Sequence, residues 1–341
     1  MVALFIHGMG HFHPQNVIDN RFLEDLDIGT SNEWILERVG IASRRTVLDL
    51  DYIRRSRNQD VRAAAEASLH SNADTGRRAA EMALANAGIG PEQVGMVIAG
   101  GCSPDTVTPA EACTIAAALG IEAPAFDVNS ACSSFAVQMH FLSMMRADAV
   151  PDFVLLISAE NNTRTVDYND RRTAVLWGDG TSAALVSTRI PAPVSASVHR
   201  MDSSPSGWDK VIIPRLGHFA QEGLTVQTFA IKRSVQCYRE LRERTKGAKL
   251  GFIGHQANLR MLDSVCKRCG IAPDAHFFNV NRFGNTGAAG APIVLSQHWN
   301  RFDAGDQVAI IVVGAGLTWA SLVVTFAHPE SSHRDPTAVT G

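Results

Sequence analysis

The chain has 341 residues, of which 45% are apolar and 19% charged, which suffices for a large hydrophobic core and excludes an intrinsically disordered protein. Its 31 Lys and Arg against 34 Asp and Glu give a net charge of −3, so a polycation that coats nucleic acid or a membrane surface is excluded too. The sequence has no apolar run of the roughly 18 residues that span a membrane, no signal-peptide pattern and only six scattered cysteines, so we expect a cytoplasmic protein without disulfides.

Short runs rich in Val and Ile alternate with longer Ala-rich segments along the chain. Buried strands are predicted at 94–99, 125–128, 153–157, 250–253, 277–280 and 308–313. Helical segments are predicted at 75–87, 135–145 and 260–269. This alternation is typical of an α/β protein in which helices cover a sheet.

The chain also contains a weak internal repeat. The segment 126–129 (FDVN) aligns with 278–281 (FNVN), and two predicted strand pairs align at nearly the same offset of about 155 residues. The common order and offset predict two copies of one fold, packed with pseudo-twofold symmetry. We divide the chain into a first half at 1–190, a second half at 191–327 and a polar tail at 328–341 that we expect to fray.

Cys132 is the first candidate for chemistry. The predicted strand 125–128 leads into small residues and then into the helical run 135–145. The cysteine therefore lies at a helix N-terminus, where unpaired N–H groups and the helix dipole stabilise a thiolate. From this segment alone, a buried structural cysteine is the alternative.

Two further polar residues follow predicted strands. His255 comes just after 250–253, and Asn285 follows 277–280, at the strand ends where open α/β sheets bind ligands. In the repeat, Asn285 aligns with Ser133, next to Cys132, and His255 aligns near Gly100. A lone histidine is more often a core residue, and a lone asparagine a turn residue. Together, at matching strand ends, the three predict a Cys/His/Asn site.

The chain resembles the β-ketoacyl-acyl-carrier-protein synthase III family of thiolase-like condensing enzymes. The motifs that carry the resemblance occur in the family's order: SNEWI (31–35) with Arg38, FDV (126–128), AC (131–132), WGDG (177–180), HQANLR (255–260), GNT (284–286) and LTW (317–319). The resemblance extends over about residues 4–326. It implies a thiolase-like α/β fold with two duplicated βαβαβαββ halves in five layers, α-β-α-β-α.

The resemblance implies an acyltransferase reaction in fatty acid initiation or a related pathway. Cys132 would take an acyl group from a coenzyme A thioester, and His255 and Asn285 would stabilise the enolate formed when malonyl-acyl-carrier protein loses carbon dioxide. The enolate then attacks the acyl-Cys132 thioester. The backbone N–H groups of Cys132 and Ala315 are the implied oxyanion hole, in a segment (GAG, 314–316) where the family usually has three glycines. No cofactor is implied beyond acyl-CoA and malonyl-acyl-carrier protein as substrates.

The resemblance also implies contacts with coenzyme A. Trp34 and Arg171 match the two residues that enclose the adenine, Arg38 matches a phosphate contact and Asn258 a pantetheine contact. Docking of an acidic carrier protein is expected on a local basic rim, for which a solvated helix face is the alternative. This basic rim consists of Lys232, Arg260, Lys267 and Arg268.

Three departures from the family concern the acyl pocket. Thr108 stands where the family commonly has a Phe that closes the pocket from the partner subunit. Asn162 replaces a common apolar residue, and Trp177 replaces a Phe. We therefore expect a primer with a polar or branched end rather than acetyl.

Two alternative functions stay open. One is an acyltransferase that moves the acyl group from Cys132 to an oxygen or nitrogen acceptor. The other is a non-catalytic partner in a heterodimer. Asn285 favours condensation, since enolate formation needs its donor group, and the intact Cys/His/Asn set counts against an inactive subunit. A homodimer is implied by the family.

Two groups of possible metal ligands are not expected to bind metal. His7, His11 and His13 fall where the family has the loop after its first strand. Cys266 and Cys269 have CxxC spacing, but the sequence has no second Cys/His pair at zinc-finger spacing, and they lie in a helical run.

Overall fold

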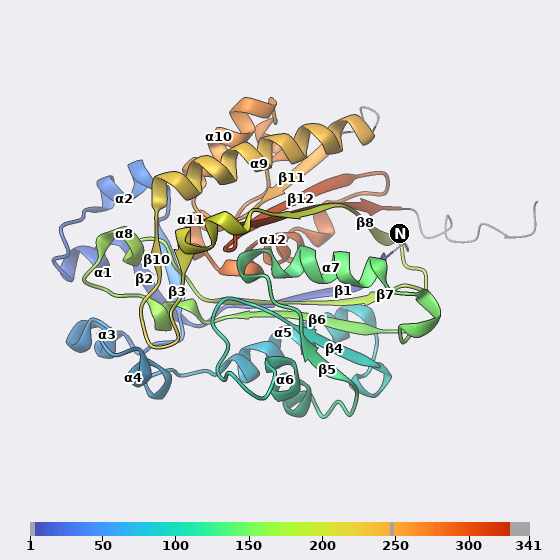
Figure 1. The fold of residues 1–341 in the computed structure, drawn as a ribbon, viewed down its shortest axis with the longest axis horizontal. Coiled ribbons are helices and arrows are strands. Elements are labelled where there is room, and N and C mark those ends of the chain that lie inside the picture. Colours follow the sequence, from blue (N-terminus) through green and yellow to red (C-terminus); the bar gives the residue numbers. More distant parts are fainter. Residues whose placement is uncertain (1–3, 246–248, 328–341) are drawn as a thin grey trace, which may run out of the picture.

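The computed structural model describes residues 4–245 and 249–327, and the predicted tail 328–341 lies outside them. The strands of the central sheet follow the order β11-β12-β13-β8-β1-β7-β6-β4-β5 (Figure 1). Their bounds are β1 (Leu4–Phe12), β4 (Met96–Ala99), β5 (Ala125–Asp127), β6 (Val154–Glu160), β7 (Gly180–Ser187), β8 (Val194–Ser203), β11 (Leu250–Gly254), β12 (Gln307–Gly314) and β13 (Thr318–Phe326). Two small ribbons are β2 (Asn16–Asp19) with β3 (Ser43–Thr46), and β9 (Val211–Ile212) with β10 (Ala220–Gln221).

Six helices form the layers around this sheet. They are α5 (Asn72–Ala87), α6 (Glu111–Leu119), α7 (Ser134–Met144), α9 (Gly223–Arg244), α10 (Leu259–Cys269) and α12 (Gly290–Gln297). Helices α5 and α6 cover one outer face, α9 and α10 cover the other, and α7 and α12 lie between the two parts of the sheet (Figure 1). Shorter helices lie to one side: α1 (Asn20–Asp25), α2 (Asn32–Arg38), α3 (Leu50–Ser56), α4 (Val61–Glu66), α8 (Arg171–Ala174) and α11 (Val280–Phe283). The predicted five-layered α-β-α-β-α architecture is confirmed.

The two parts of the sheet repeat the same topology. In the first, β4 pairs parallel with β6, β6 antiparallel with β7, and β7 antiparallel with β1. In the second, β11 pairs parallel with β12, β12 antiparallel with β13, and β13 antiparallel with β8. Strands β1 and β8, the first of each copy, pair antiparallel with each other and join the copies. The chain passes from the first copy to the second between β7 and β8, through residues 188–193.

The middle layer explains why two helices are apolar on almost every side. Phe135, Met139 and Leu142 of α7 and Val294 and Leu295 of α12 are all buried in one cluster with residues of both sheet parts. A helix enclosed by two sheets has no solvent face, so it lacks the polar stripe of a surface helix. Packing of this layer therefore holds the two copies in one fixed arrangement.

Two predictions about local structure are wrong. The segment 277–280 is not a strand. Only an isolated bridge forms, between Phe252 and His276, because Gln256 Oε1 accepts the N–H groups of Asn279 and Val280 and the short helix α11 begins there. The prediction that the N-terminal histidines lie in a loop after the first strand is also wrong, since β1 runs through to Phe12 and contains His7 and His11.

The histidines of this segment have structural partners. His11 Nδ1 lies 2.9 Å from Ser296 Oγ, and the His13 ring stacks on Phe283 at 3.8 Å between centroids. Burial lowers the pKa of His13 to about 3. Within residues 4–245 and 249–327, three or more His, Cys, Asp or Glu side chains never gather as metal ligands would, and none of the helices is long and apolar enough to cross a membrane.

Strand β1 packs unusually close to α5, and this contact can be tested. A Cβ on Gly10 would lie 2.0 Å from the backbone oxygen of Ala79. We expect Gly10→Ala to lower the free energy of unfolding by about 1–3 kcal/mol, because helix and strand must move apart. The measurement is urea unfolding. Gly223→Ala is the matched control: the nearest atom, Gln221 Nε2, is 4.0 Å away, so its effect should stay within about 0.5 kcal/mol. Equal effects of the two substitutions would contradict the packing argument.

Candidate active site

Cys132 lies in a tight turn between β5 and α7. Residues Ala131–Ser133 form a single 3-10 turn, and Ala131 has a φ of 46°, in the left-handed region that is costly for alanine. The turn packs on Gly314 at the end of β12, where a Cβ would meet Ser130 O at 2.9 Å. The second copy of the fold therefore holds the Cys132 turn of the first in place.

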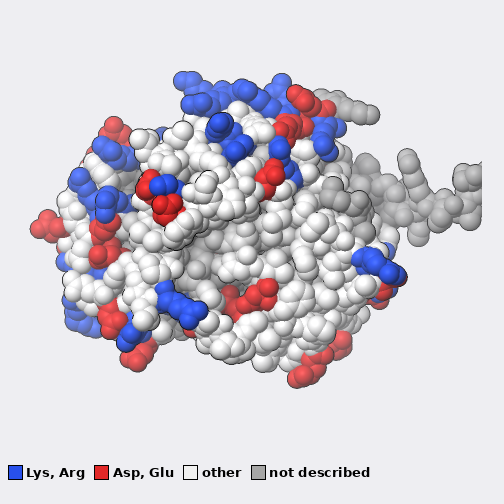
Figure 2. Space-filling view, viewed as in Figure 1, with Lys and Arg blue, Asp and Glu red and all other residues white. Residues whose placement is uncertain are grey.

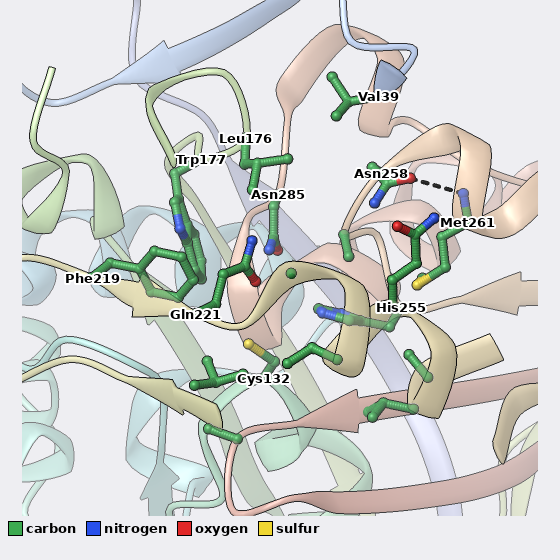
Figure 3. A pocket seen from close by; sticks show the side chains of 18 of the residues that line it. Val39, Cys132, Leu176, Trp177, Phe219, Gln221, His255, Asn258, Met261 and Asn285 are labelled. Carbon is green, nitrogen blue, oxygen red and sulfur yellow. Dashed lines mark hydrogen bonds between the residues drawn. The ribbon is translucent and has the colours of Figure 1, made fainter. Parts of the chain in front are cut away.

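His255 follows β11 directly, and the neighbouring glutamine fixes its loop. Gln256 Nε2 donates to Gly254 O at 2.7 Å, while its Oε1 accepts from Asn279 N at 3.1 Å. The loops after β11 and before α11 are thus tied together. The His255 side chain points toward Cys132 (Figure 3).

Asn285 is held by bonds that determine which way its amide faces. Its backbone N donates to Leu176 O at 2.8 Å, and its backbone O accepts from Gly178 N at 3.0 Å. Its side-chain Oδ1 accepts from Gly287 N at 3.0 Å, which leaves the side-chain N–H groups as donors. The WGDG segment that contains Gly178 therefore positions Asn285.

The three predicted catalytic residues line one cavity of about 200 Å³. Cys132, His255 and Asn285 approach it from three different loops (Figure 3). Apolar walls surround them and exclude much of the water, which strengthens electrostatic interactions inside. These walls include Val39, Leu176, Trp177, Phe219 and Met261.

Cys132 is buried, yet its surroundings favour the thiolate. The thiol of Cys102, whose Sγ lies 3.5 Å from Cys132 Sγ, contributes most, and His255 adds a hydrogen bond and a favourable charge interaction. Against the opposing effect of burial, these groups lower the pKa of Cys132 to about 5. The pKa of Cys102 is raised in turn, chiefly by its bond to Cys132 and then by burial. Cys102 is therefore the thiol of the pair and Cys132 the thiolate.

Glu160 lies behind the site and connects two of its loops. Its carboxyl group accepts the backbone N–H of Cys102 at 2.9 Å and of Ala288, three residues after Asn285, at 2.6 Å. Full burial raises its pKa to about 8. Neither Glu160 nor Cys102 was found from the sequence. Their position in the sequence could have indicated them. Glu160 ends β6 and Cys102 follows β4, and the carboxyl ends of both strands lie at the edge of the sheet where Cys132 lies.

The residues expected to contact coenzyme A lie at and beside the cavity entrance. Trp34 on α2 has two cationic neighbours, Arg38 with its guanidinium carbon 5.1 Å from the ring centroid and Arg171 at 5.0 Å. Arg38 and Asn258 line the cavity, and Asn258 also caps α10 by accepting from Met261 N at 2.8 Å. Aromatic rings and guanidinium planes both stack on nucleobases, so Trp34 with Arg38 and Arg171 is suited to bind a base.

The three predicted pocket residues lie in different surroundings. Trp177 lines the cavity and packs edge-on against Phe219, with ring centroids 4.8 Å apart. Asn162 is fully buried, and its amide bonds Glu160 and Ser103 instead of lining the cavity at Cys132. Thr108 is exposed on the surface of this chain.

Ala315 lines the cavity beside Cys132. Its φ is not positive, so an alanine is tolerated where the family has a glycine. The four residues of the basic rim are all exposed, Lys232 on α9 and the others on α10. Figure 2 shows Lys and Arg side chains gathered over these two helices.

The chain matches family models, related sequences and solved structures of one synthase family. A family model described as 3-oxoacyl-[acyl-carrier-protein] synthase III matches residues 126–202, and the model of its C-terminal part matches 250–326. The β-ketoacyl-[acyl-carrier-protein] synthase III of Symbiobacterium thermophilum is 31% identical over 94% of this chain and 97% of its own length. The synthase III of Sulfurovum is 30% identical over 94% of this chain and 95% of its own length. The crystal structure of the Aquifex aeolicus synthase III superposes with a TM-score of 0.83 at 28% identity, covering 95% of this chain and 100% of that one.

The thiolate state of Cys132 predicts a pH profile for its alkylation. Because the thiolate is the reactive form, the rate with iodoacetamide should stay level at neutral pH and fall only as the pH approaches about 5. In Cys102→Ala the inflection should move to higher pH, since the largest contribution to the lowered pKa is gone. The exposed Cys113, changed to Ser, is the control and should leave the profile unchanged. A wild-type inflection near 9 would contradict the assignment.

Proposed function

The chain belongs to the 3-oxoacyl-acyl-carrier-protein synthase III family of acyl-transferring condensing enzymes, and we propose that it condenses an acyl-CoA primer with malonyl-acyl-carrier protein. Cys132 carries the acyl group between the two half-reactions. The product is a β-ketoacyl-carrier protein, one two-carbon unit longer than the primer. The observation that carries this proposal is the convergence of Cys132, His255 and Asn285 on one cavity.

In the first half-reaction the Cys132 thiolate attacks the thioester carbonyl of the acyl-CoA. The lowered pKa of Cys132 supplies the nucleophile at neutral pH without a separate base. The backbone N–H groups of Cys132 and Ala315 bind the oxyanion of the tetrahedral intermediate. Coenzyme A leaves as its thiolate, with its adenine held by Trp34 and Arg171, its phosphates by Arg38 and its pantetheine arm by Asn258.

In the second half-reaction the malonyl thioester loses carbon dioxide, and its carbonyl oxygen becomes the enolate oxygen. His255 and Asn285 stabilise this negative charge with N–H donors. Asn285 is suited to the role because Gly287 N–H occupies its Oδ1 and leaves its N–H groups available. The enolate carbon then attacks the acyl-Cys132 carbonyl, and the Cys132 thiolate leaves. The residues named account for each charge that develops, so no cofactor is needed.

Large apolar side chains form much of the primer pocket beside Cys132. A second cavity of about 200 Å³ next to Cys132 is lined by residues that include Trp177, Phe219 and Ile213. With its amide bonded to Glu160, Asn162 offers no polar group to an acyl chain. We therefore propose a primer with an apolar end rather than one with a polar end.

The proposed assembly is a cytoplasmic homodimer. Thr108 stands at a position that reaches the partner's pocket in relatives, and its exposure on the single chain agrees with that arrangement. In the dimer each Thr108 would help to close the pocket of the other subunit.

Asn285→Ala separates the two half-reactions. We expect condensation to fall by roughly 10²–10³, the usual loss for one donor to a developing oxyanion. Acyl transfer from acyl-CoA to Cys132 should fall far less, because Asn285 acts on the enolate of the second step. The measurements are single-turnover acylation by intact mass and formation of β-ketoacyl-carrier protein. Equal losses in both steps would contradict the assigned role.

The basic rim predicts how the carrier protein docks. The double variant Lys267→Glu and Arg268→Glu should raise KM for malonyl-carrier protein by roughly tenfold at low salt, because complementary charges steer association. Acylation by acyl-CoA should not change. Arg146→Glu, at an exposed cation that follows α7, is the control. An unchanged KM and salt dependence in the double variant would place docking elsewhere.

A further inference from the structure

A second thiol lies against the nucleophile. Strands β4 and β5 are neighbours and parallel, with Ala99 opposite Asp127. Cys102 follows the end of β4 by three residues, and Cys132 follows the end of β5 by five. Because the carboxyl ends of parallel neighbours lie at the same edge, the two loops bring both sulfur atoms together, 3.5 Å apart. All six cysteines are reduced in this structure.

The separation of the two sulfur atoms is short enough for a disulfide to form after a small movement. A disulfide bond is about 2.05 Å long, so the sulfur atoms need to approach each other by only about 1.5 Å. Cys102 lies in the irregular connection between β4 and α6, where neither a strand ladder nor a helix fixes its side chain. Its backbone N–H stays anchored to Glu160, which keeps the thiol directed at Cys132.

A small oxidant has a path to this pair. The second cavity is lined by both Cys102 and Cys132. Cys132 also lines the first cavity, through which the acyl-CoA would enter. Hydrogen peroxide is much smaller than either cavity and can therefore reach the nucleophile when no acyl group protects it.

We infer that Cys102 is a resolving thiol that forms a reversible disulfide with Cys132 under peroxide. The Cys132 thiolate attacks peroxide and becomes a sulfenic acid, with loss of hydroxide. The sulfur of Cys102 then attacks the sulfenic sulfur, and its proton leaves with the departing hydroxide as water. The hydroxide from the first step takes up the proton that Cys132 released on ionisation, so in total one peroxide is reduced to two waters while two thiols are oxidised to one disulfide. A dithiol reductant reverses the change by thiol–disulfide exchange.

The consequence is protection of the nucleophile. A sulfenic acid without a nearby thiol proceeds to sulfinic acid, which thiol reductants do not restore. Formation of the disulfide stops that progression and leaves the enzyme inactive but recoverable. The inference goes beyond the proposed function, because it needs only the two sulfur atoms and no substrate.

The experiment treats the whole chain with a small excess of hydrogen peroxide and maps its peptides without reduction. Trypsin leaves Cys102, Cys113 and Cys132 on one peptide, because no Lys or Arg occurs between 79 and 145. Cleavage after Glu111 and Glu122 separates the three. The expected result is a cross-link between the peptides of Cys102 and Cys132, with a loss of two hydrogens, and full return of Cys132 alkylation after dithiothreitol.

Variants of Cys102 distinguish disulfide formation from direct oxidation of Cys132 to a sulfinic acid. In Cys102→Ala and Cys102→Ser, treated at a pH above each variant's own alkylation inflection so that Cys132 is a thiolate, Cys132 should gain two oxygens, and dithiothreitol should not restore its alkylation, measured against each variant's own untreated sample. Cys113→Ser should behave as the wild type. The inference is overturned if wild type and Cys102 variants lose Cys132 to the same irreversible extent, or if no cross-link forms. Because the readout is the mass of peptides, this failure is distinct from a failure of the condensation reaction.

Discussion

The site depends on backbone contacts between the two copies of the fold, closer than any side chain would allow. Gly314 of the second copy lies against the turn that carries Cys132, and Gly178 of the first lies against Phe283, where a Cβ would be 2.0 Å from the backbone oxygen. These contacts place the loops of His255 and Asn285 around the same cavity as Cys132. The apolar middle layer of α7 and α12 then keeps the two copies at this spacing.

Burial strongly affects the pKa values of the ionisable groups in the site. In a low-dielectric cavity a single hydrogen bond or charge has a large effect on protonation. Cys132 becomes a thiolate because Cys102 and His255 oppose the cost of burial, whereas Glu160, without an opposite charge, has a raised pKa. Cys132 and Glu160 therefore differ in protonation state because their nearest partners differ.

Much of the fold could be predicted from the sequence, since strands β4, β6, β11 and β12 are short apolar runs and the repeat offset is nearly constant. The absence of a strand at 277–280 could not be predicted, because Gln256, more than twenty residues away, accepts the N–H groups that a strand ladder would use. The histidines of β1 were misplaced because Gly8 and Gly10, which pack on α5, remove the alternation that marks a strand. Cys132, His255 and Asn285 were found by motif. Cys102 and Glu160 were not, since their roles exist only through contacts across neighbouring loops.

The central claim is that Cys132 carries an acyl group that a malonyl-derived enolate then removes. The direct measurement is the intact mass of the protein after exposure to a panel of acyl-CoAs, followed by a chase with malonyl-carrier protein, with Cys132→Ala in parallel. The account predicts a mass gain that requires Cys132 and disappears in the chase as β-ketoacyl-carrier protein forms. An acyl group that loads on Cys132 but persists in the chase, leaving only for an oxygen or nitrogen acceptor, would contradict it, as would loading that survives in Cys132→Ala.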